Sequence, residues 1–238
     1  MTSPKVSAIV SAYHAEKYLE QRLKNLAEQE VEGGHEVIVV CQRDSQEFKI
    51  VKDWVSSDGN VPVVPHYTDD IPTVYAAWNL AIEQASGEYL TNCNSDDLLY
   101  PGALQALSTA LNEHKAYSMS YFDWERVQKH GEAPVGVFRF AEGELDKLMA
   151  GCFLGPGPMW RKSLHAKYGL FNPDFKSAGD YEFWLRLAYN GEKFYHVRGK
   201  PLGAHLERED GVEHRSPLLT TWETARARAP YRKEYAHE

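Results

Sequence analysis

The 238-residue sequence has no apolar run of the roughly 20 residues that a membrane-spanning helix needs. We also expect no secretory leader, because Met1–Lys5 leads directly into a short apolar strand. Cysteine is scarce: Cys41, Cys93 and Cys152 lack the spacing of a metal finger, and their odd number favours reduced thiols. We therefore expect a cytoplasmic protein that makes at most peripheral contact with the inner face of a membrane.

Positive charge is also scarce, since 26 basic residues stand against 34 acidic ones and the net charge is −8. A nucleic-acid-binding protein normally shows a basic surface, so we expect no nucleic-acid partner. Hydrophobic residues make up 43% of the chain and charged residues 25%, which is typical of a globular protein. The length allows one large domain or two small ones, and we find no internal repeat.

Strongly apolar segments alternate with amphipathic ones along the first hundred residues. The apolar segments predict buried strands at 6–13, 35–40, 61–66 and 88–93. The segments between them predict helices at 16–29, 44–56 and 73–86. Strands and helices that alternate at this spacing favour an α/β fold with a mainly parallel, Rossmann-like sheet covered by helices.

The pattern is less regular in the rest of the chain. Proline is common in the first turn of a helix, so Pro101 predicts the start of a helix that runs to about residue 112. An aromatic-rich stretch predicts one strand at 116–127, followed by a hairpin or loop at 130–143, and glycine and proline bend the backbone at 153–161. The remaining segments predict a short helix at 144–150, a strand at 193–197 and a terminal helix at 220–235.

Four polar residues directly follow the strand predicted at 88–93: Asn94, Ser95, Asp96 and Asp97. Two adjacent carboxylates in a partly buried place repel each other and lose water, so ionising both has a cost. A divalent cation removes that conflict, and Mg²⁺ and Mn²⁺ favour oxygen ligands. The carboxyl ends of strands in open α/β sheets are also where ligands bind. The acidic loop therefore predicts either a metal–phosphate site or an ordinary turn, since all four residues are turn formers.

Two short segments that lead into this loop carry a family resemblance. They are an Ala-x-x-Asn segment at Ala76–Asn79 and an Ala-x-Gly-Glu-Tyr segment at Ala85–Tyr89. In this order they resemble the family 2 inverting glycosyltransferases, which have the GT-A fold, and the resemblance extends from Val6 to about His205. It implies a single GT-A domain over residues 1–238. Residues 1–100 would form the nucleotide-binding half, 101–215 the acceptor-binding and catalytic half with a small acceptor-side subregion, and 216–238 a C-terminal helix.

The resemblance implies a binding site for a nucleotide-diphosphate sugar, formed by Ala12, Tyr13, Gln42, Asn79, Asn94 and Asp96. Tyr13 would pack against the nucleobase, and ordinary packing at a strand end is the alternative. Gln42 stands where the family has an aspartate that holds the base. Its amide offers a donor and an acceptor to the edge of uracil or thymine, or else it is simply a polar loop residue.

The resemblance also implies a metal site and phosphate contacts. Asp96, Asp97 and His205 would hold Mn²⁺ or Mg²⁺, with His214 as the second choice of histidine. Arg208 and Arg215 would meet the phosphates. For each chosen histidine a place on the surface is the alternative, because the chain has ten histidines.

The segment Gly169–Phe175 and the downstream Asp180 resemble the part of the family that carries the catalytic base, although Gly179 stands where the family often has a glutamate. The alternative is local, because Ser177 and Asp180 form a Ser-x-x-Asp capping pattern before an apolar-periodic helix. The acceptor side would include Trp160 and Tyr181, and a place in the core is the alternative for these large side chains.

The resemblance therefore implies a metal-dependent inverting glycosyltransferase, a hexosyltransferase that uses a UDP- or dTDP-type nucleotide sugar. Its acceptor would be a hydroxyl group of a glycan or a lipid-linked molecule, in cell-surface polysaccharide or glycan assembly. Two other functions are the alternatives. A nucleotidyltransferase would carry a glycine-rich, basic phosphate loop after the first strand, and Tyr13–Glu16 is not one. A non-catalytic relative that binds sugars or partners would have no need of Asp96, Asp97 and Asp180.

Overall fold

The computed structural model describes residues 3–57, 62–142, 145–208 and 216–232. Its centre is a seven-stranded sheet in the order β10-β6-β9-β4-β1-β2-β3. The strands are β1 (Val6–Ala12), β2 (His35–Gln42), β3 (Val63–Thr68), β4 (Tyr89–Asn92), β6 (Met119–Phe122), β9 (Met159–Arg161) and β10 (Phe194–Val197). All neighbours are parallel except the two pairs that β9 makes. The predicted mainly parallel α/β sheet is confirmed.

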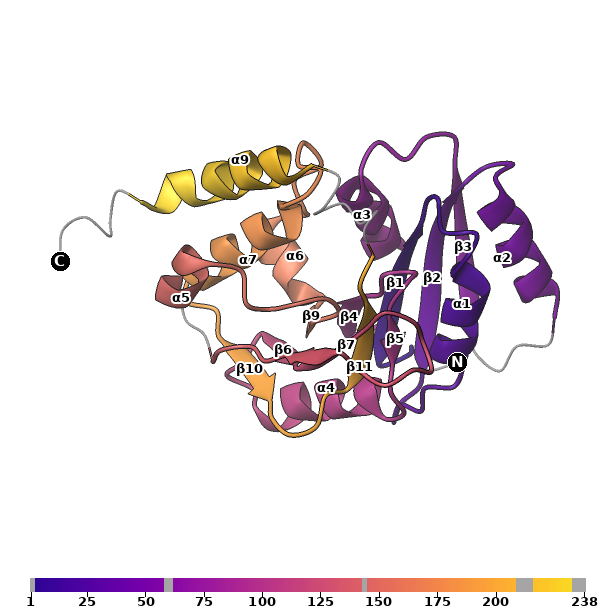
Figure 1. Ribbon diagram of the computed structural model, residues 1–238, viewed down its shortest axis with the longest axis horizontal. Helices are drawn as coiled ribbons and strands as arrows, with labels where there is room; N and C mark the ends of the chain where they lie inside the picture. Colours follow the sequence, from indigo (N-terminus) through magenta and orange to yellow (C-terminus); the bar gives the residue numbers. More distant parts are fainter. Residues whose placement is uncertain (1–2, 58–61, 143–144, 209–215, 233–238) are drawn as a thin grey trace.

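Helices cover both faces of this sheet (Figure 1). They are α1 (Leu19–Ala27), α2 (Gln46–Ser56), α3 (Val74–Gln84), α4 (Ala103–Glu113), α5 (Leu145–Ala150), α6 (Ser163–Tyr168), α7 (Gly179–Tyr189) and α9 (Pro217–Arg228), followed by the short 3₁₀ helix η1 (Ala229–Tyr231). The structure thus contains the first three helices that the sequence predicts, with ends shifted by at most three residues. These shifts are ordinary because helix ends fray.

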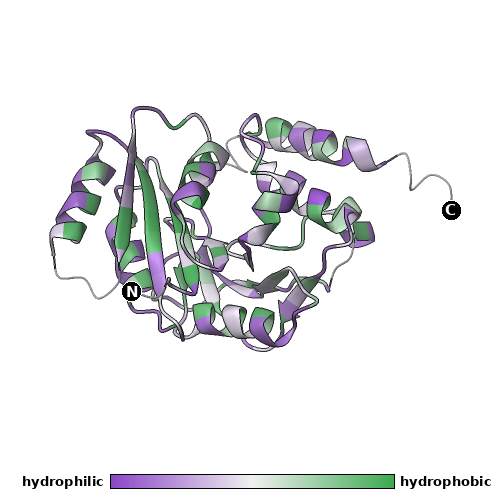
Figure 2. Ribbon diagram, turned by 180° about the vertical axis from the view of Figure 1, so that it is seen from behind, coloured by the Kyte–Doolittle hydropathy of each residue, from purple (hydrophilic) through white to green (hydrophobic). Residues whose placement is uncertain are grey.

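The alternation of side chains along the strands divides the core in two. Ile9 and Ile38 point to the cluster that contains α3 and α7, whereas Val10 and Val39 point to the cluster that contains α1 and α4. Successive side chains of a strand face opposite sides of the sheet, so continuous apolar strands need a helical layer on each face. Figure 2 shows the hydrophobic central strands between helices that turn hydrophilic residues outward.

A second, four-stranded sheet lies beside the first and corrects one prediction. Its order is β5-β11-β7-β8, with β5 at Leu98–Leu99, β7 at Trp124–Val127, β8 at Gly136–Phe138 and β11 at Gly203–Leu206. The single strand predicted at 116–127 is wrong: β6 and β7 belong to different sheets. The buried carboxylate of Asp123 lies at the break, where it accepts hydrogen bonds from Phe140 N (3.0 Å) and His196 Nε2 (2.9 Å). The β7–β8 pair confirms the predicted hairpin.

Two further differences lie in irregular segments. Pro101 does not open α4, because Pro101 and Gly102 form a turn in which Gly102 has φ 83°, a left-handed conformation that glycine adopts readily. The bent segment at 153–161 ends in β9, which runs antiparallel between β4 and β6 and which the sequence did not reveal. A three-residue strand has too few residues to show alternation.

The terminal helix packs on the rest of the fold instead of standing alone. Helix α9 lies against α7 (Figure 1). Of the helix predicted at 216–238, the structure has α9 and η1, and residues 233–238 lie outside the described part. No helix within the described residues has the length and apolar character needed to cross a membrane.

Candidate active site

The acidic loop lies where β4 ends, between the central sheet and the small one. Asp97 is almost fully buried, and its carboxylate is held on both oxygens. Oδ1 accepts hydrogen bonds from His205 Nδ1 (2.8 Å) and Leu206 N (3.1 Å), and Oδ2 accepts one from Asn94 Nδ2 (3.1 Å). The pairing of β11 with β5 brings His205 here, because β5 directly follows the loop.

Asp96 projects from the same loop and is more exposed. Its Oδ2 pairs with Arg208 Nη1 at 2.8 Å, and its backbone carbonyl accepts a hydrogen bond from His130 Nε2 at 2.7 Å. The Arg208 guanidinium lies 4.8 Å from the centre of the Tyr18 ring. The loop therefore has His130 as one neighbour that can carry positive charge, and His205 of β11 and Arg208 just after that strand as two more. His214 and Arg215, the other predicted contacts, lie outside the described residues.

The chemistry of this loop fits a divalent ion that a ligand helps to hold. In the described part of the chain no three His, Cys, Asp or Glu side chains form a ready-made metal cluster. Mg²⁺, however, is usually held by one or two carboxylates and completes its shell with water and phosphate oxygens. Asp97 Oδ1 and His205 Nδ1 lie 2.8 Å apart, about the spacing of neighbouring ligands on an ion with bonds of about 2.1 Å. Asp97 and His205 are therefore placed as two neighbouring ligands would be, and Asp96 on the same loop stays the predicted third.

The ends of β1 and β2 lie at the same edge of the sheet. Ala12 pairs with Cys41, so Tyr13 and Gln42 leave the two strands side by side. The Tyr13 ring is 52% exposed although its neighbour Ala12 is buried. Gln42 Nε2 donates to the Asp69 carbonyl at 3.1 Å, which orients the amide. An exposed aromatic ring beside an oriented amide is suited to a flat heterocycle with hydrogen-bonding edges.

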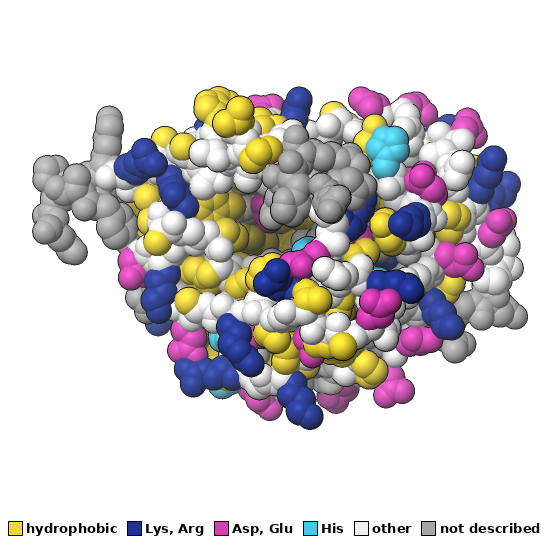
Figure 3. Space-filling model, viewed as in Figure 1, with side chains coloured by type: hydrophobic (Ala, Val, Ile, Leu, Met, Phe, Trp, Pro, Cys, Tyr) yellow, Lys and Arg dark blue, Asp and Glu magenta, His cyan; other side chains and the backbone are white. Residues whose placement is uncertain are grey.

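Asp180 reaches this edge from another part of the chain. It is the second residue of α7, and its Oδ1 accepts a hydrogen bond from the Tyr75 hydroxyl at 3.1 Å. Tyr75 is in the first turn of α3, which follows β3 and therefore begins at the carboxyl edge of the sheet. Asp180 thus lies at the same edge as the acidic loop. Figure 3 shows a hollow near the middle of the face viewed, with hydrophobic side chains in its depth and charged side chains on its rim.

A buried carboxylate from α9 holds the segment before Asp180, and the predicted capping pattern is wrong. Helix α7 has Ala178 as its N-cap without a side-chain cap bond, and Ser177 Oγ pairs with Thr220 Oγ1 at 2.7 Å. Glu223 instead accepts hydrogen bonds from the backbone N–H groups of Lys176, Ser177 and Ala178, at 2.8 to 3.1 Å. Sequence reasoning missed Glu223 because no local signal links residues so far apart in the chain.

Three other predicted site residues have internal partners. Asn79 donates to Phe171 O (2.8 Å) and accepts from Phe171 N (3.0 Å), so its amide ties α3 to the segment before α7. Trp160 has no exposed surface, and Tyr181 is 3% exposed with its hydroxyl bonded to Leu148 O. In this structure neither aromatic ring presents a face to an acceptor, so both take the core position that the sequence left as the alternative.

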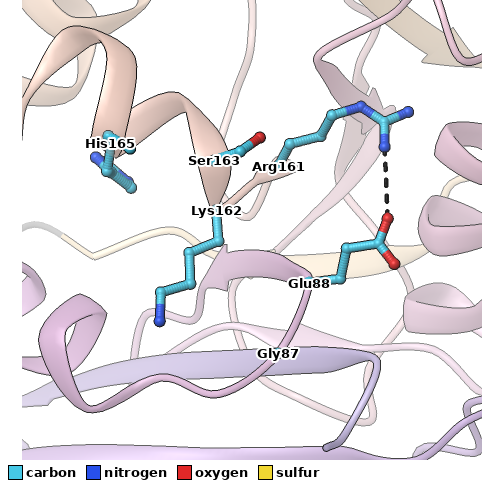
Figure 4. A pocket seen from close by; sticks show the side chains of 7 residues that line it. Gly87, Glu88, Arg161, Lys162, Ser163 and His165 are labelled. Atoms are coloured by element: carbon cyan, nitrogen blue, oxygen red, sulfur yellow. Dashed lines mark ion pairs between the residues drawn. The ribbon is translucent and has the colours of Figure 1, made fainter.

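A pocket of about 470 Å³ lies at the opposite edge of the sheet and is distinct from this site (Figure 4). Glu88 lies just before β4 and Arg161 ends the antiparallel β9, so both mark the amino ends of the parallel strands. Arg161 pairs with Glu88 at 3.7 Å and donates to Leu111 O, while Lys162 donates to Ala85 O. Both cations are therefore bonded to carboxylate or backbone oxygens of the protein itself.

His165, which also lines that pocket, gives the protein a predicted sensitivity to acid. Trp160 Nε1 is only a donor and lies 2.9 Å from His165 Nε2, so Nε2 must accept, while Nδ1 lies 3.0 Å from Gly169 O. Burial lowers the pKa of His165 to about 4. In the unfolded chain the pKa is near the ordinary 6.5, so between about pH 6.5 and about pH 4 the unfolded state takes up the proton and the folded state does not.

The free energy of unfolding should therefore fall by up to about 3 kcal/mol as the pH is lowered from about 6.5 to about 4, and this term should be constant above that range. Urea unfolding at a series of pH values measures it. The variant His165→Gln cannot be protonated, so its stability should change less over this interval. Equal pH dependence in the two proteins would show that His165 is not the group responsible.

Comparison with known proteins provides an independent view of the chain. The family model described as glycosyl transferase family 2 matches residues 7–164. An uncharacterized glycosyltransferase of Bacillus subtilis, YwdF, is 29% identical over 132 residues, 53% of this chain and 47% of the relative. The poly(ribitol-phosphate) beta-N-acetylglucosaminyltransferase TarS of Staphylococcus aureus is 25% identical over 224 residues, 85% of this chain and 37% of the relative. This chain thus covers less than half the length of either relative.

Solved structures share the fold. S. aureus TarS 1–349 in complex with UDP-GlcNAc has a TM-score of 0.75 at 23% identity, covering 93% of this chain and 64% of that chain. The mannosyltransferase PcManGT from Pyrobaculum calidifontis, in complex with GDP-Man and Mn²⁺, has a TM-score of 0.69 at 18% identity, covering 94% of this chain and 65% of that chain. The likeness identifies the architecture as that of GT-A structures.

Proposed function

This chain belongs to glycosyl transferase family 2, and from that premise we propose that it transfers a sugar from a nucleoside-diphosphate sugar to a hydroxyl group by a single inverting displacement. One observation carries the proposal: the acidic loop with Asp97 and the separate carboxylate of Asp180 lie at the same edge of the sheet. Such a displacement needs one group to hold the leaving diphosphate and another to accept the proton of the attacking hydroxyl.

The donor would bind across the ends of β1, β2 and β4. The exposed ring of Tyr13 would stack on the base, and Ala12 would let the base approach the backbone. Asn94 and Asp96 would contact the ribose–diphosphate, and Arg208 would meet a phosphate through a charge-assisted hydrogen bond. A bound Mn²⁺ or Mg²⁺ would neutralise charge on the departing diphosphate, held by Asp96, Asp97 and His205. Asn79 stays a predicted contact of the nucleotide sugar, although its amide also bonds to Phe171 O.

The proton would pass to Asp180. A hydroxyl group is a poor nucleophile until its proton leaves, and a carboxylate in hydrogen-bond reach can accept that proton as the bond to the anomeric carbon forms. The hydroxyl of Tyr75 and the backbone contacts of Glu223 hold the start of α7. A base at the start of a packed helix is rigidly placed, which favours one-step displacement.

We further propose a glycan or lipid-linked acceptor at the cell surface, and peripheral contact with the inner face of a membrane. The name of TarS, which describes an enzyme acting on poly(ribitol-phosphate), supports the first part. The outer side of α9 supports the second, because Leu218 (86% exposed) and Trp222 (59% exposed) lie one turn apart beside Arg226. Apolar and basic side chains on one helix face are typical of interfacial helices.

The nucleobase preference is testable at Gln42. One N–H of its amide bonds to Asp69 O, which leaves the second N–H and the carbonyl oxygen for the imide edge of uracil or thymine. UDP and dTDP should therefore bind more tightly than GDP, and Gln42→Ala should weaken UDP binding about 10-fold. Isothermal titration with the three nucleotides measures this. If GDP binds best to the unaltered protein, the assignment of Gln42 to base recognition fails.

Transfer from labelled nucleotide sugars tests the function itself. Purified protein with Mn²⁺ is incubated with a panel of donors and with glycan and polyol-phosphate acceptors, and the anomeric configuration of any product is read by NMR. An inverted glycoside that is absent with Asp180→Asn supports the proposal. Donor binding without transfer to any acceptor would favour a non-catalytic relative. Formation of a nucleotide sugar from a nucleoside triphosphate and a sugar phosphate would favour a nucleotidyltransferase.

A further inference from the structure

A buried tyrosine fills the space beside Asp180. Tyr75, on α3, is 3% exposed, and its ring lies where a side chain at position 179 would be. A Cβ atom added to Gly179 would lie 2.7 Å from Tyr75 Cδ2 and Cε2, closer than such atoms approach in folded proteins. The chain therefore needs glycine at 179 for this tyrosine to fit against α7. Residues 75 and 179 form a matched pair across more than a hundred residues of sequence.

The hydroxyl of Tyr75 points at the start of α7. It lies 3.1 Å from Asp180 Oδ1, to which it donates a hydrogen bond. Burial, followed by the nearby negative charge of Asp180, raises the pKa of Tyr75 well above its ordinary value. The phenol therefore keeps its proton at working pH and acts as the donor, with the Asp180 carboxylate as the acceptor.

The ring has little freedom to move. It packs edge-on against Trp78 with ring centres 5.4 Å apart, and it lies 6.2 Å from the ring of Phe171. The two hydrogen bonds between Asn79 and Phe171 join α3 to the segment before α7. A donor that is held by packing on both sides keeps its direction, which is what a positioned hydrogen bond requires.

We propose that Tyr75 is the positioning residue for Asp180: its hydroxyl fixes the orientation of the carboxylate and lowers its basicity, and Gly179 admits it. The role of this hydrogen bond in catalysis rests on the proposed function, whereas the bond between Tyr75 and Asp180 does not. A hydrogen bond donated to a carboxylate stabilises the charged form, so the pKa of Asp180 is lower with the Tyr75 hydroxyl than without it. Among the described residues, the charged groups by this helix start include Glu223 from α9, Lys176 in the preceding segment, and Glu182 with its partner Arg186.

The test is Tyr75→Phe, which keeps the ring and removes only the hydroxyl. In protein labelled with ¹³C at aspartate carboxyl carbons, the Asp180 signal is assigned from its loss in Asp180→Asn. Titration by NMR should show the pKa of Asp180 raised by about one unit in Tyr75→Phe. Tyr89→Phe is the matched control, because its buried hydroxyl bonds to Asn112 Oδ1 near the opposite edge of the sheet. It should leave the Asp180 titration unchanged.

The turnover number and its pH profile provide the second measurement. Tyr75→Phe should lower kcat about 10-fold at neutral pH and move the acidic limb of its pH profile upward by about one unit. The KM for the donor should not change, since the substitution removes only the hydroxyl, which bonds to Asp180 and to no donor-binding residue named above. A purely structural role would lower the melting temperature and leave both titration and pH profile in place.

The outcomes separate this inference from the proposed function. An unshifted Asp180 titration in folded Tyr75→Phe overturns the inference, whatever the activity. A shifted titration in a protein that transfers no sugar upholds the pairing and rejects the proposed function. Gly179→Ala gives a second variant, in which the added methyl displaces the Tyr75 ring. The Asp180 titration should shift in the same direction, and an unchanged titration there would also count against the inference.

Discussion

Asp180→Asn should lower the turnover number at least about 100-fold, because a positioned general base typically contributes about 10²–10⁴-fold to the rate. Asparagine has nearly the size of aspartate, and its carbonyl oxygen can still accept the hydrogen bond from the Tyr75 hydroxyl. The fold, the melting temperature and donor binding should therefore stay close to those of the unaltered protein. Initial rates of transfer from a labelled nucleotide sugar, at saturating donor and acceptor, measure the effect.

The same variant separates catalysis from a role in helix stability. Since Ala178 is the N-cap of α7 and makes no side-chain cap bond, a capping role for Asp180 has no support in the geometry. If Asp180 nevertheless acted only in stability, Asp180→Asn would transfer sugar at nearly the normal rate with a lower melting temperature. A rate within a few-fold of the unaltered protein would remove Asp180 from the mechanism. The variant Asp174→Asn, in the segment before α7, is a control for the loss of one carboxylate.

Asp97→Asn should remove the part of nucleotide binding that depends on a divalent ion. Adding Mn²⁺ should tighten the binding of UDP to the unaltered protein by at least about 100-fold, whereas the variant should bind UDP equally weakly with Mn²⁺ and with EDTA. The substitution keeps an oxygen that can accept from Leu206 N, so the β11 strand should stay in place. It removes the negative charge that faces His205 and that would balance a cation.

Calorimetry with UDP, in Mn²⁺ and in EDTA, gives the four affinities. Asp53→Asn on the exposed side of α2 is the matched control and should behave like the unaltered protein. If EDTA leaves the affinity of the unaltered protein unchanged, the metal assignment of Asp97 is wrong. In that case Arg208, next to the loop, would be the side chain to test for phosphate binding.

Local patterns were sufficient for the core formed by residues 6–93. The apolar runs predicted as strands at 6–13 and 35–40 become the neighbouring strands β1 and β2, and the helix after each strand packs on the sheet. The prediction succeeds because a strand that is buried on both faces needs apolar residues at consecutive positions, and such a run can be recognised in the sequence. The acidic loop could also be recognised from the sequence, since its residues follow one another in the chain. Gly179 was visible only as a departure from the family pattern.

The contacts that make the site are set by tertiary structure. Asp97 meets His205 across 108 residues, and Tyr75 meets Asp180 across 105. Which histidine reaches the Asp97 carboxylate depends on the pairing of β11 with β5, and which tyrosine reaches Asp180 depends on the packing of α3 against α7. Such contacts form only after distant segments close on one another, so no local periodicity encodes them. Burial of Trp160 follows the same rule, because the ring is equally compatible with a surface or a core until its neighbours Phe171 and Trp184 surround it.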